Sequence, residues 1–147
     1  MKTRYGVHPE HFKTFTTDQT RDEFLVQSVM QEGKIELVYS HYDRFIFGGV
    51  VPTSAAIRLP NDDDLRAEYF LERRELGVLN LGDAGSVTVD GTTYDLGRFD
   101  CLYVGRGSKS VSFASKDGSR PAKFYLNSAP AHKEYPTTKA TQSDANK

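Results

Sequence analysis

The 147-residue chain is poor in cysteine and in long apolar runs, and each shortage excludes a class of protein. The lone Cys101 leaves no partner for an internal disulfide, which argues against a disulfide-held secreted domain and fits a reducing compartment. No run of apolar residues approaches the roughly 20 that span a bilayer. Residues 1–5 also lack the apolar segment of a secretory signal. We therefore expect a cytoplasmic protein with no membrane partner.

The chain also lacks an excess of charge of either sign. It has 19 basic and 20 acidic residues, and its net charge is -1. This balance gives no electrostatic basis for binding nucleic acid, so no nucleic-acid partner is expected. Hydrophobic residues make up 37% of the chain, which is enough for one core in a domain of this length.

A long stretch with helical periodicity is missing too, and short alternating segments take its place. In residues 85–96, Val87 and Val89 alternate with polar residues, and Tyr94 and Leu96 do the same on the return. Asp90-Gly91 lies between them and is typical of a tight hairpin turn. Leu102 and Val104 begin a third strand of this meander. The pattern predicts an all-β protein, an antiparallel sandwich or barrel.

The flanking segments extend this pattern along the chain. We expect a loop or a short helical turn at the surface over residues 60–68, and a bulge or kink at Gly48-Gly49. Residues 1–20 are predicted to form an N-terminal arm, with a short helix after Pro9 as one possibility, and residues 21–136 a single barrel. Residues 137–147 are polar and are expected to be a disordered tail or the start of a linker. Further strands are predicted at 24–29, 35–39, 45–51, 69–71, 76–81, 111–113 and 124–126.

The glycines and apolar residues between Gly82 and Gly107 resemble the central hairpins of cupin barrels, a jelly-roll-like fold. Cupins that bind a metal carry two histidines and a glutamate before these strands and a further histidine after them. Glu75 falls near the place of the glutamate, but Glu68, Phe70 and Ser110 fall near those of the histidines. We therefore expect no metal and no cofactor in this chain. The four histidines are scattered over other segments, at His8, His11, His41 and His132.

Three longer segments, residues 40–49, 69–82 and 121–132, narrow the resemblance. Together they resemble the N-terminal half of the 5-keto-4-deoxyuronate isomerases, also called 4-deoxy-L-threo-5-hexosulose-uronate ketol-isomerases. The likeness extends from about Phe24 to Lys139.

This resemblance implies a two-barrel subunit about twice as long as this chain, and a homo-oligomer that is often a hexamer. It implies zinc bound in the C-terminal barrel. The implied reaction converts a sugar-acid substrate, 4-deoxy-L-threo-5-hexosulose uronate, to 3-deoxy-D-glycero-2,5-hexodiulosonate in pectin and uronate degradation. The half seen here would scaffold and oligomerise, and would be inactive alone.

Four residues are candidates for contact with the substrate, namely Arg44, Arg73, Arg74 and Glu75. The arginines suit a substrate carboxylate, because a planar guanidinium matches its two oxygens. Alternatively, these charges pair with one another or across a subunit contact. Strand alternation puts Arg73 and Glu75 on one face of the strand and Arg74 on the other. Glu75 then either points into the barrel or is exposed. No residue is assigned a catalytic role.

Two other functions stay open at this point. One is a stand-alone, non-catalytic cupin-like barrel that binds a uronate or mediates assembly. The other is a metal-free sugar epimerase that uses His41 or His132 as its base.

Overall fold

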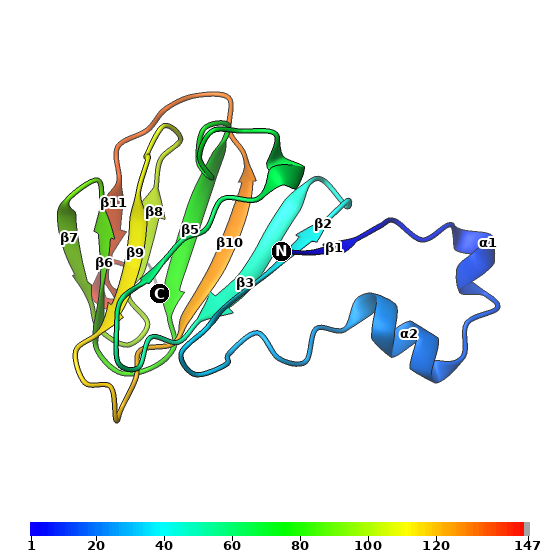
Figure 1. Ribbon diagram of the computed structural model, residues 1–147, viewed down its shortest axis with the longest axis horizontal. Coiled ribbons are helices and arrows are strands. Elements are labelled where there is room, and N and C mark those ends of the chain that lie inside the picture. Colours follow the sequence, from blue (N-terminus) through cyan, green and yellow to red (C-terminus); the bar gives the residue numbers. More distant parts are fainter. Residues whose placement is uncertain (146–147) are drawn as a thin grey trace.

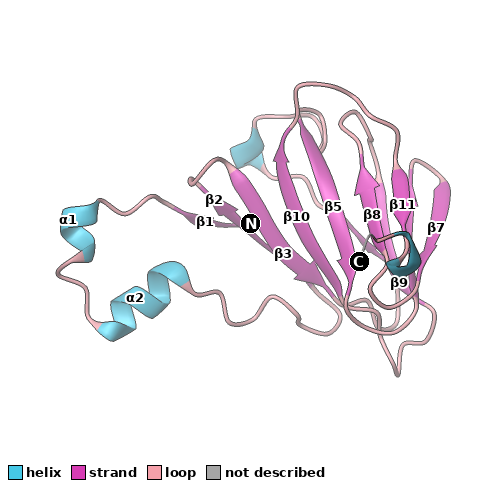
Figure 2. Cartoon of the chain, turned by 180° about the vertical axis from the view of Figure 1, so that it is seen from behind, coloured by secondary structure: helices cyan, strands magenta, loops and turns pink. Residues whose placement is uncertain are grey.

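A computed structural model describes residues 1–145 and gives a two-layer β sandwich from which an N-terminal arm projects (Figure 1). Helices within these residues are short and lie outside the two layers, as Figure 2 shows. They are α1 (Pro9–Phe12), α2 (Thr17–Phe24) and the 3-10 turns η1 (Asp63–Leu65) and η2 (Gln142–Asp144). None of them has the length and apolar character needed to cross a membrane.

Within the described residues, the strands form one sheet of seven and one of four. The larger sheet has the order β1-β2-β3-β10-β5-β8-β11, and the smaller has the order β4-β9-β6-β7. The all-β prediction is confirmed, but neither sheet closes on itself, so the barrel is a sandwich of two open sheets. The strands are β1 (Lys2–Arg4), β2 (Ile35–Ser40), β3 (Phe45–Val50), β4 (Ile57–Arg58), β5 (Arg74–Asn80), β6 (Gly85–Val89), β7 (Thr92–Leu96), β8 (Cys101–Val104), β9 (Val111–Ser115), β10 (Phe124–Pro130) and β11 (Thr138–Ala140).

The core lies between the sheets and follows from strand alternation. On β5, Leu76 and Val78 point inward and are buried, and on β6 Val87 does the same. Phe113 of the small sheet meets Phe124 of the large sheet, with ring centroids 5.7 Å apart. A fully buried side chain of this size contributes about 1.5–3 kcal/mol to folding, so this shared apolar layer holds the sheets together.

The predicted hairpin at Asp90-Gly91 is confirmed. Both turn residues have positive φ, 47° and 88°, as a two-residue turn between twisted strands requires. The Asp90 carboxylate also accepts hydrogen bonds from the backbone N–H groups of Lys109 and Ser110, at 3.0 and 2.8 Å to Oδ1. The turn of β6 and β7 is thereby tied to the loop that leads into β9.

Two predicted strands are wrong because local hydrogen bonds favour other structures. The predicted strand at 24–29 starts at the last residue of α2, whose capping box joins Thr16 and Gln19 in both directions, and residues 25–29 form no strand. At 69–71 the chain turns, because the Glu72 carboxylate accepts from the Glu68 N–H at 2.6 Å. The loop or short helical turn predicted at 60–68 is confirmed, because η1 lies within it.

The bulge or kink predicted at Gly48-Gly49 is also absent, and β3 keeps its register through both glycines. Gly48 pairs with Leu37 and Leu126 on the two neighbouring strands. A Cβ at Gly48 would collide with the backbone oxygen of Glu36, and one at Gly49 with that of Val29. Glycine at these two positions lets neighbouring backbone segments approach the strand closely, which a side chain would prevent.

The two ends of the chain occupy the two edges of the large sheet. β1 pairs in parallel with β2, and the arm that follows extends away from the sandwich (Figures 1 and 2). A helix after Pro9 is confirmed, and α2 runs across the predicted boundary at residue 20.

The tail beyond residue 136 is more ordered than expected. β11 pairs with β8, and Lys139 Nζ lies 3.1 Å from Asp100 Oδ2, so the prediction of disorder is wrong for residues 138–144. Residues 146–147 of the predicted tail lie outside the described residues. That the tail begins a linker stays a prediction.

Candidate functional site

Three of the four predicted site residues line one pocket at the end of the large sheet where β5 begins and β10 ends. Its cavity volume is about 180 Å³. Arg44 comes from the turn between β2 and β3, whereas Arg73 and Arg74 lie at the start of β5. We call this the arginine pocket, and it is lined by Tyr39, Arg44, Asp64, Leu65, Ala67, Phe70, Arg73, Arg74 and Pro130.

Arg74 is the best-fixed group of the arginine pocket. It is only 6% exposed, because strand alternation turns it to the inner face of the large sheet. Its Nε donates to Ser128 Oγ at 3.1 Å, and its Nη2 donates to the carbonyls of Ser128 at 2.8 Å and Arg44 at 2.6 Å. Burial lowers the pKa of Arg74 from its ordinary value, since the charged form is taken out of water.

The Arg44 carbonyl reaches Arg74 through an uncommon backbone conformation. Asp43 and Arg44 have φ values of 54° and 55°, in the left-handed region that L residues other than glycine rarely adopt. Arg66, which follows η1 beside the pocket wall, has φ of 50° as well. Such conformations cost about 1 kcal/mol or more each and persist where the surrounding structure enforces them.

Arg73 takes part in the ion pairing that was one alternative, whereas its contact with a substrate stays a prediction. It lines the arginine pocket, and its Nη2 also lies 3.3 Å from Glu72 Oε1. Its side chain is 63% exposed, so this ion pair contributes little to stability. Arg73 precedes β5, which is why both arginines reach one pocket without a bulge in the strand.

Glu75 lies apart from the other three residues. It is on the outer face of β5, where Tyr103 Oη donates to its Oε2 at 2.8 Å. Burial and this hydrogen bond raise the pKa of Tyr103 to about 12. The interpretation of Glu75 as an interior carboxylate is therefore wrong. Alternation places Arg74, not Glu75, on the inner face at the start of β5, so a cation stands where the cupin comparison led us to expect an acid.

The described residues do not fit a metal. Among residues 1–145, no three His, Cys, Asp or Glu side chains come together in a way that would hold an ion. Arg74 and Phe70, which lie at this end of the interior, are not metal ligands. His41 stacks on Tyr5, with ring centroids 4.6 Å apart, and His132 is exposed beyond β10. That this chain binds no metal or other cofactor stays a prediction.

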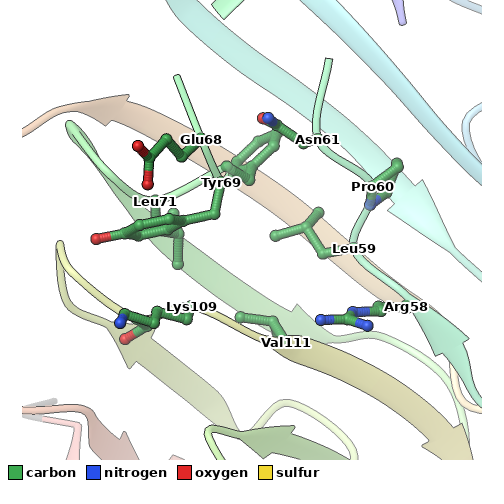
Figure 3. Close-up of a pocket in the computed structure, with 11 residues that line it drawn as sticks. Arg58, Leu59, Pro60, Asn61, Glu68, Tyr69, Leu71, Lys109 and Val111 are labelled. Atoms are coloured by element: carbon green, nitrogen blue, oxygen red, sulfur yellow. The ribbon is translucent and has the colours of Figure 1, made fainter.

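A second pocket, of about 350 Å³, lies at the same end of the sandwich and shares Phe70 as a wall with the arginine pocket. We call it the loop pocket, because three loops build it. Figure 3 shows polar side chains standing around an apolar floor formed by Leu59, Leu71 and Val111. The polar groups include Arg58, Asn61, Glu68 and Lys109.

Backbone hydrogen bonds fix the walls of the loop pocket. Leu59 N donates to Val111 O, and Gly107 N donates to Leu71 O, both at 2.8 Å. These bonds hold the loops in place, and the polar side chains on the loops supply donors and acceptors for a ligand with hydroxyl groups. Among the residues of this pocket, the resemblance to cupins in the sequence had pointed only to Glu68 and Phe70. Arg58 and Lys109 lacked a signal, because only the tertiary structure brings their loops together.

Comparison with known proteins agrees with this architecture. A family model described as KduI/IolB matches residues 24–147. The 4-deoxy-L-threo-5-hexosulose-uronate ketol-isomerase of Formosa agariphila is 56% identical over 146 residues, which are 99% of this chain and 52% of that protein. The protein of the same name from Shouchella clausii is 54% identical over 145 residues, again 99% of this chain and 52% of the relative. The chain thus spans about half the length of the curated relatives it matches.

Among solved structures, the cupin domain of Schizosaccharomyces pombe Cnp3 has the same fold. Its TM-score is 0.52 at 19% sequence identity, over 73% of this chain and 70% of that one. This likeness concerns the fold alone, and it confirms that the two open sheets form a cupin-type sandwich.

Proposed function

The chain belongs to the KduI/IolB family, and on that premise we propose that it is the N-terminal half of a 4-deoxy-L-threo-5-hexosulose-uronate ketol-isomerase. The observation that carries this proposal is the 56% identity to the Formosa agariphila protein of that name over nearly the whole chain. Because the chain spans only about half of that relative, the complete activity is assigned to a longer protein, in the cytoplasm, that acts on a sugar acid in uronate breakdown.

The reaction moves a carbonyl group to the adjacent carbon. It needs a base that removes a proton next to the carbonyl and an acid that returns a proton to the neighbouring position. In the arginine pocket Asp64 is the one carboxylate among the lining residues, and it accepts from Thr3 Oγ1 at 3.0 Å. This set of groups supports anion binding better than proton transfer. We therefore place the proton-transfer groups, and the zinc that the resemblance implies, in the other half of the longer protein.

The N-terminal arm supports a second part of the proposal, which is that this half also mediates homo-oligomer assembly. Phe12 packs edge-on against Phe24, with ring centroids 5.6 Å apart, yet the two residues are 47% and 51% exposed. Exposed aromatic side chains clustered on a projecting segment are typical of protein contacts. Phe12→Ser with Phe24→Ser should lower the oligomeric mass measured by sedimentation, whereas Phe99→Ser, an exposed aromatic of the sandwich, should leave it unchanged.

A chimera tests the isomerase assignment. This chain replaces the matching 146 residues of the Formosa agariphila protein, and turnover of the deoxy-uronate is measured. We expect the chimera to retain activity, and the chain alone to show none. A matched control chimera carries the Cnp3 cupin domain, which has the fold but not the sequence, and should be inactive. A folded but inactive chimera would refute the assignment, and turnover by the chain alone would refute the scaffold role.

A further inference from the structure

The charges of the arginine pocket are unbalanced. Three guanidinium groups and a single carboxylate, that of Asp64, line it. Within residues 1–145, neither Arg44 nor Arg74 lies within salt-bridge distance of a carboxylate, and Arg73 pairs with Glu72 only at the exposed rim. The pocket thus holds a surplus of positive charge that the described part of the chain does not neutralise.

Arg74 makes this surplus costly for the protein. Its three hydrogen bonds all go to neutral oxygens, those of Ser128 and of the Arg44 backbone. They occupy Nε and Nη2, so in the described chain Nη1 keeps two N–H donors without a protein acceptor. Among the described residues Nη1 is not one of the fully buried polar atoms that lack a partner, so it reaches the surface of the pocket, where an outside anion can meet this charge.

The backbone around Arg74 is arranged to hold it in this position. Arg44 adopts a left-handed conformation, and its carbonyl accepts from Nη2. Tyr39 flanks the group, with its ring centroid 5.9 Å from Arg74 Cζ. A guanidinium fixed in this way presents its remaining nitrogen, Nη1, in a constant direction, which suits a charge-assisted hydrogen bond to one oxygen of a carboxylate.

The remaining walls set the size and nature of the ligand. Tyr39, Leu65, Phe70 and Pro130 give the pocket apolar surface beside the cations. Its volume of about 180 Å³ gives room for a carboxylate and the adjoining carbons of one sugar, with the C–H face of that sugar against the aromatic rings.

We propose that the arginine pocket is a binding site for the carboxylate of a monomeric sugar acid, with Arg74 and Arg44 as the residues that hold the carboxylate. The anion site follows from the geometry of the pocket alone, whereas the choice of a sugar acid as its ligand rests on the proposed function. The site lies in the half to which we assign no proton-transfer group, so it binds substrate-like acids outside the reacting centre.

Calorimetric titration of the 147-residue chain with D-galacturonate tests the proposal, with D-galactose as the neutral sugar of matched shape. We expect galacturonate to bind and galactose not to bind. Arg74→Met and Arg44→Met should each weaken binding at least about tenfold, which is the effect of losing one hydrogen bond to a charged group. Arg98→Met is the matched control, because Arg98 stacks on Phe99 away from the pocket, and it should bind as the wild type does.

Arg44→Met keeps the test valid if Arg74→Met does not fold, since the Arg44 backbone that supports Arg74 is retained. Equal binding of galactose, unchanged binding by the folded Arg44 variant, or no binding at millimolar galacturonate would overturn the proposal. Equally tight binding of acetate and phosphate would overturn the choice of a sugar acid. Because the titration measures binding and not turnover, the two tests are independent. Loss of binding would not refute the isomerase assignment, and an inactive chimera would not refute the binding site.

Discussion

Asn80, at the end of β5, offers a sharp test of how the two sheets are joined. It is wholly buried, and it is a polar side chain at a position where alternation calls for an apolar one. Its amide group links the end of β5 to the β7–β8 turn and to β10. Nδ2 donates to the carbonyls of Asp83 (2.8 Å), Leu96 (3.1 Å) and Gly97 (3.2 Å), and Oδ1 accepts from the N–H groups of Gly82 (3.1 Å) and Lys123 (3.3 Å).

Asn80→Leu keeps the volume of the side chain but removes all five hydrogen bonds. The bond to Leu96 O is fully buried, and leaving that carbonyl without a partner costs about 1–3 kcal/mol. The other four partners lie where water reaches them in part, and at about 0.5 kcal/mol each they add about 2 kcal/mol. Burial of the leucine offsets about 1 kcal/mol of this loss. The free energy of unfolding should therefore fall by about 2–4 kcal/mol.

Urea unfolding followed by circular dichroism measures this loss. With a slope of roughly 2 kcal/mol per M, the midpoint should move down by about 1–2 M. The matched control is Asn127→Leu, on the outer-facing side of β10, for which the described residues provide no side-chain hydrogen bond. This control should change stability by no more than about 0.5 kcal/mol. Similar midpoints for the two variants would refute the view that the Asn80 amide group joins the sheets.

Two further predictions concern the hairpin and the outer face of β5. Gly91→Ala should destabilise the chain by about 1 kcal/mol in thermal unfolding, because φ is 88° at this position while an added Cβ would contact no other atom. Gly6→Ala, at a position where φ is not positive, should leave stability unchanged. Equal effects of the two substitutions would contradict the explanation by backbone conformation. Tyr103 should titrate near pH 12 by tyrosinate absorbance against a Tyr103→Phe reference, and Glu75→Gln should lower that pKa. Since the pKa of Tyr103 is raised in the folded state, the stability that its hydroxyl contributes is complete below about pH 10 and is lost as pH rises toward 12. An ordinary pKa of Tyr103 in the wild type would contradict its hydrogen bond to Glu75.

The parts of the fold that sequence reasoning recovered are those with local signals. Alternation in β5 and β6 and the Asp90-Gly91 turn carry their structure in a few adjacent residues. The capping box of Thr16 and Gln19 is a local signal as well, but the prediction at 24–29 was based on the apolar residues that follow it. β11 had no such signal, because its three exposed residues are held by pairing with β8 and by the ion pair of Lys139.

The candidate site divides in the same way. Alternation was sufficient to place Arg74 and Glu75 on opposite faces of β5, and the structure agrees. The approach of the Arg44 carbonyl to Arg74 could not be predicted, because it depends on two left-handed residues that sequence statistics disfavour. The loop pocket depends on three loops far apart in the chain, for which a single sequence carries no distance information.

The position of β10 has a consequence for how the chain is made. β10 is Phe124–Pro130, yet it lies in the middle of the large sheet, between β3 and β5, and it pairs with both along most of their length. A growing chain that has left the ribosome only as far as residue 123 has a gap where its central strand belongs, with unpaired edges on both sides. Such edges are prone to pairing with other chains. The large sheet can therefore assemble only after residues 124–130 have left the ribosome, and until then its two open edges can pair with those of other chains.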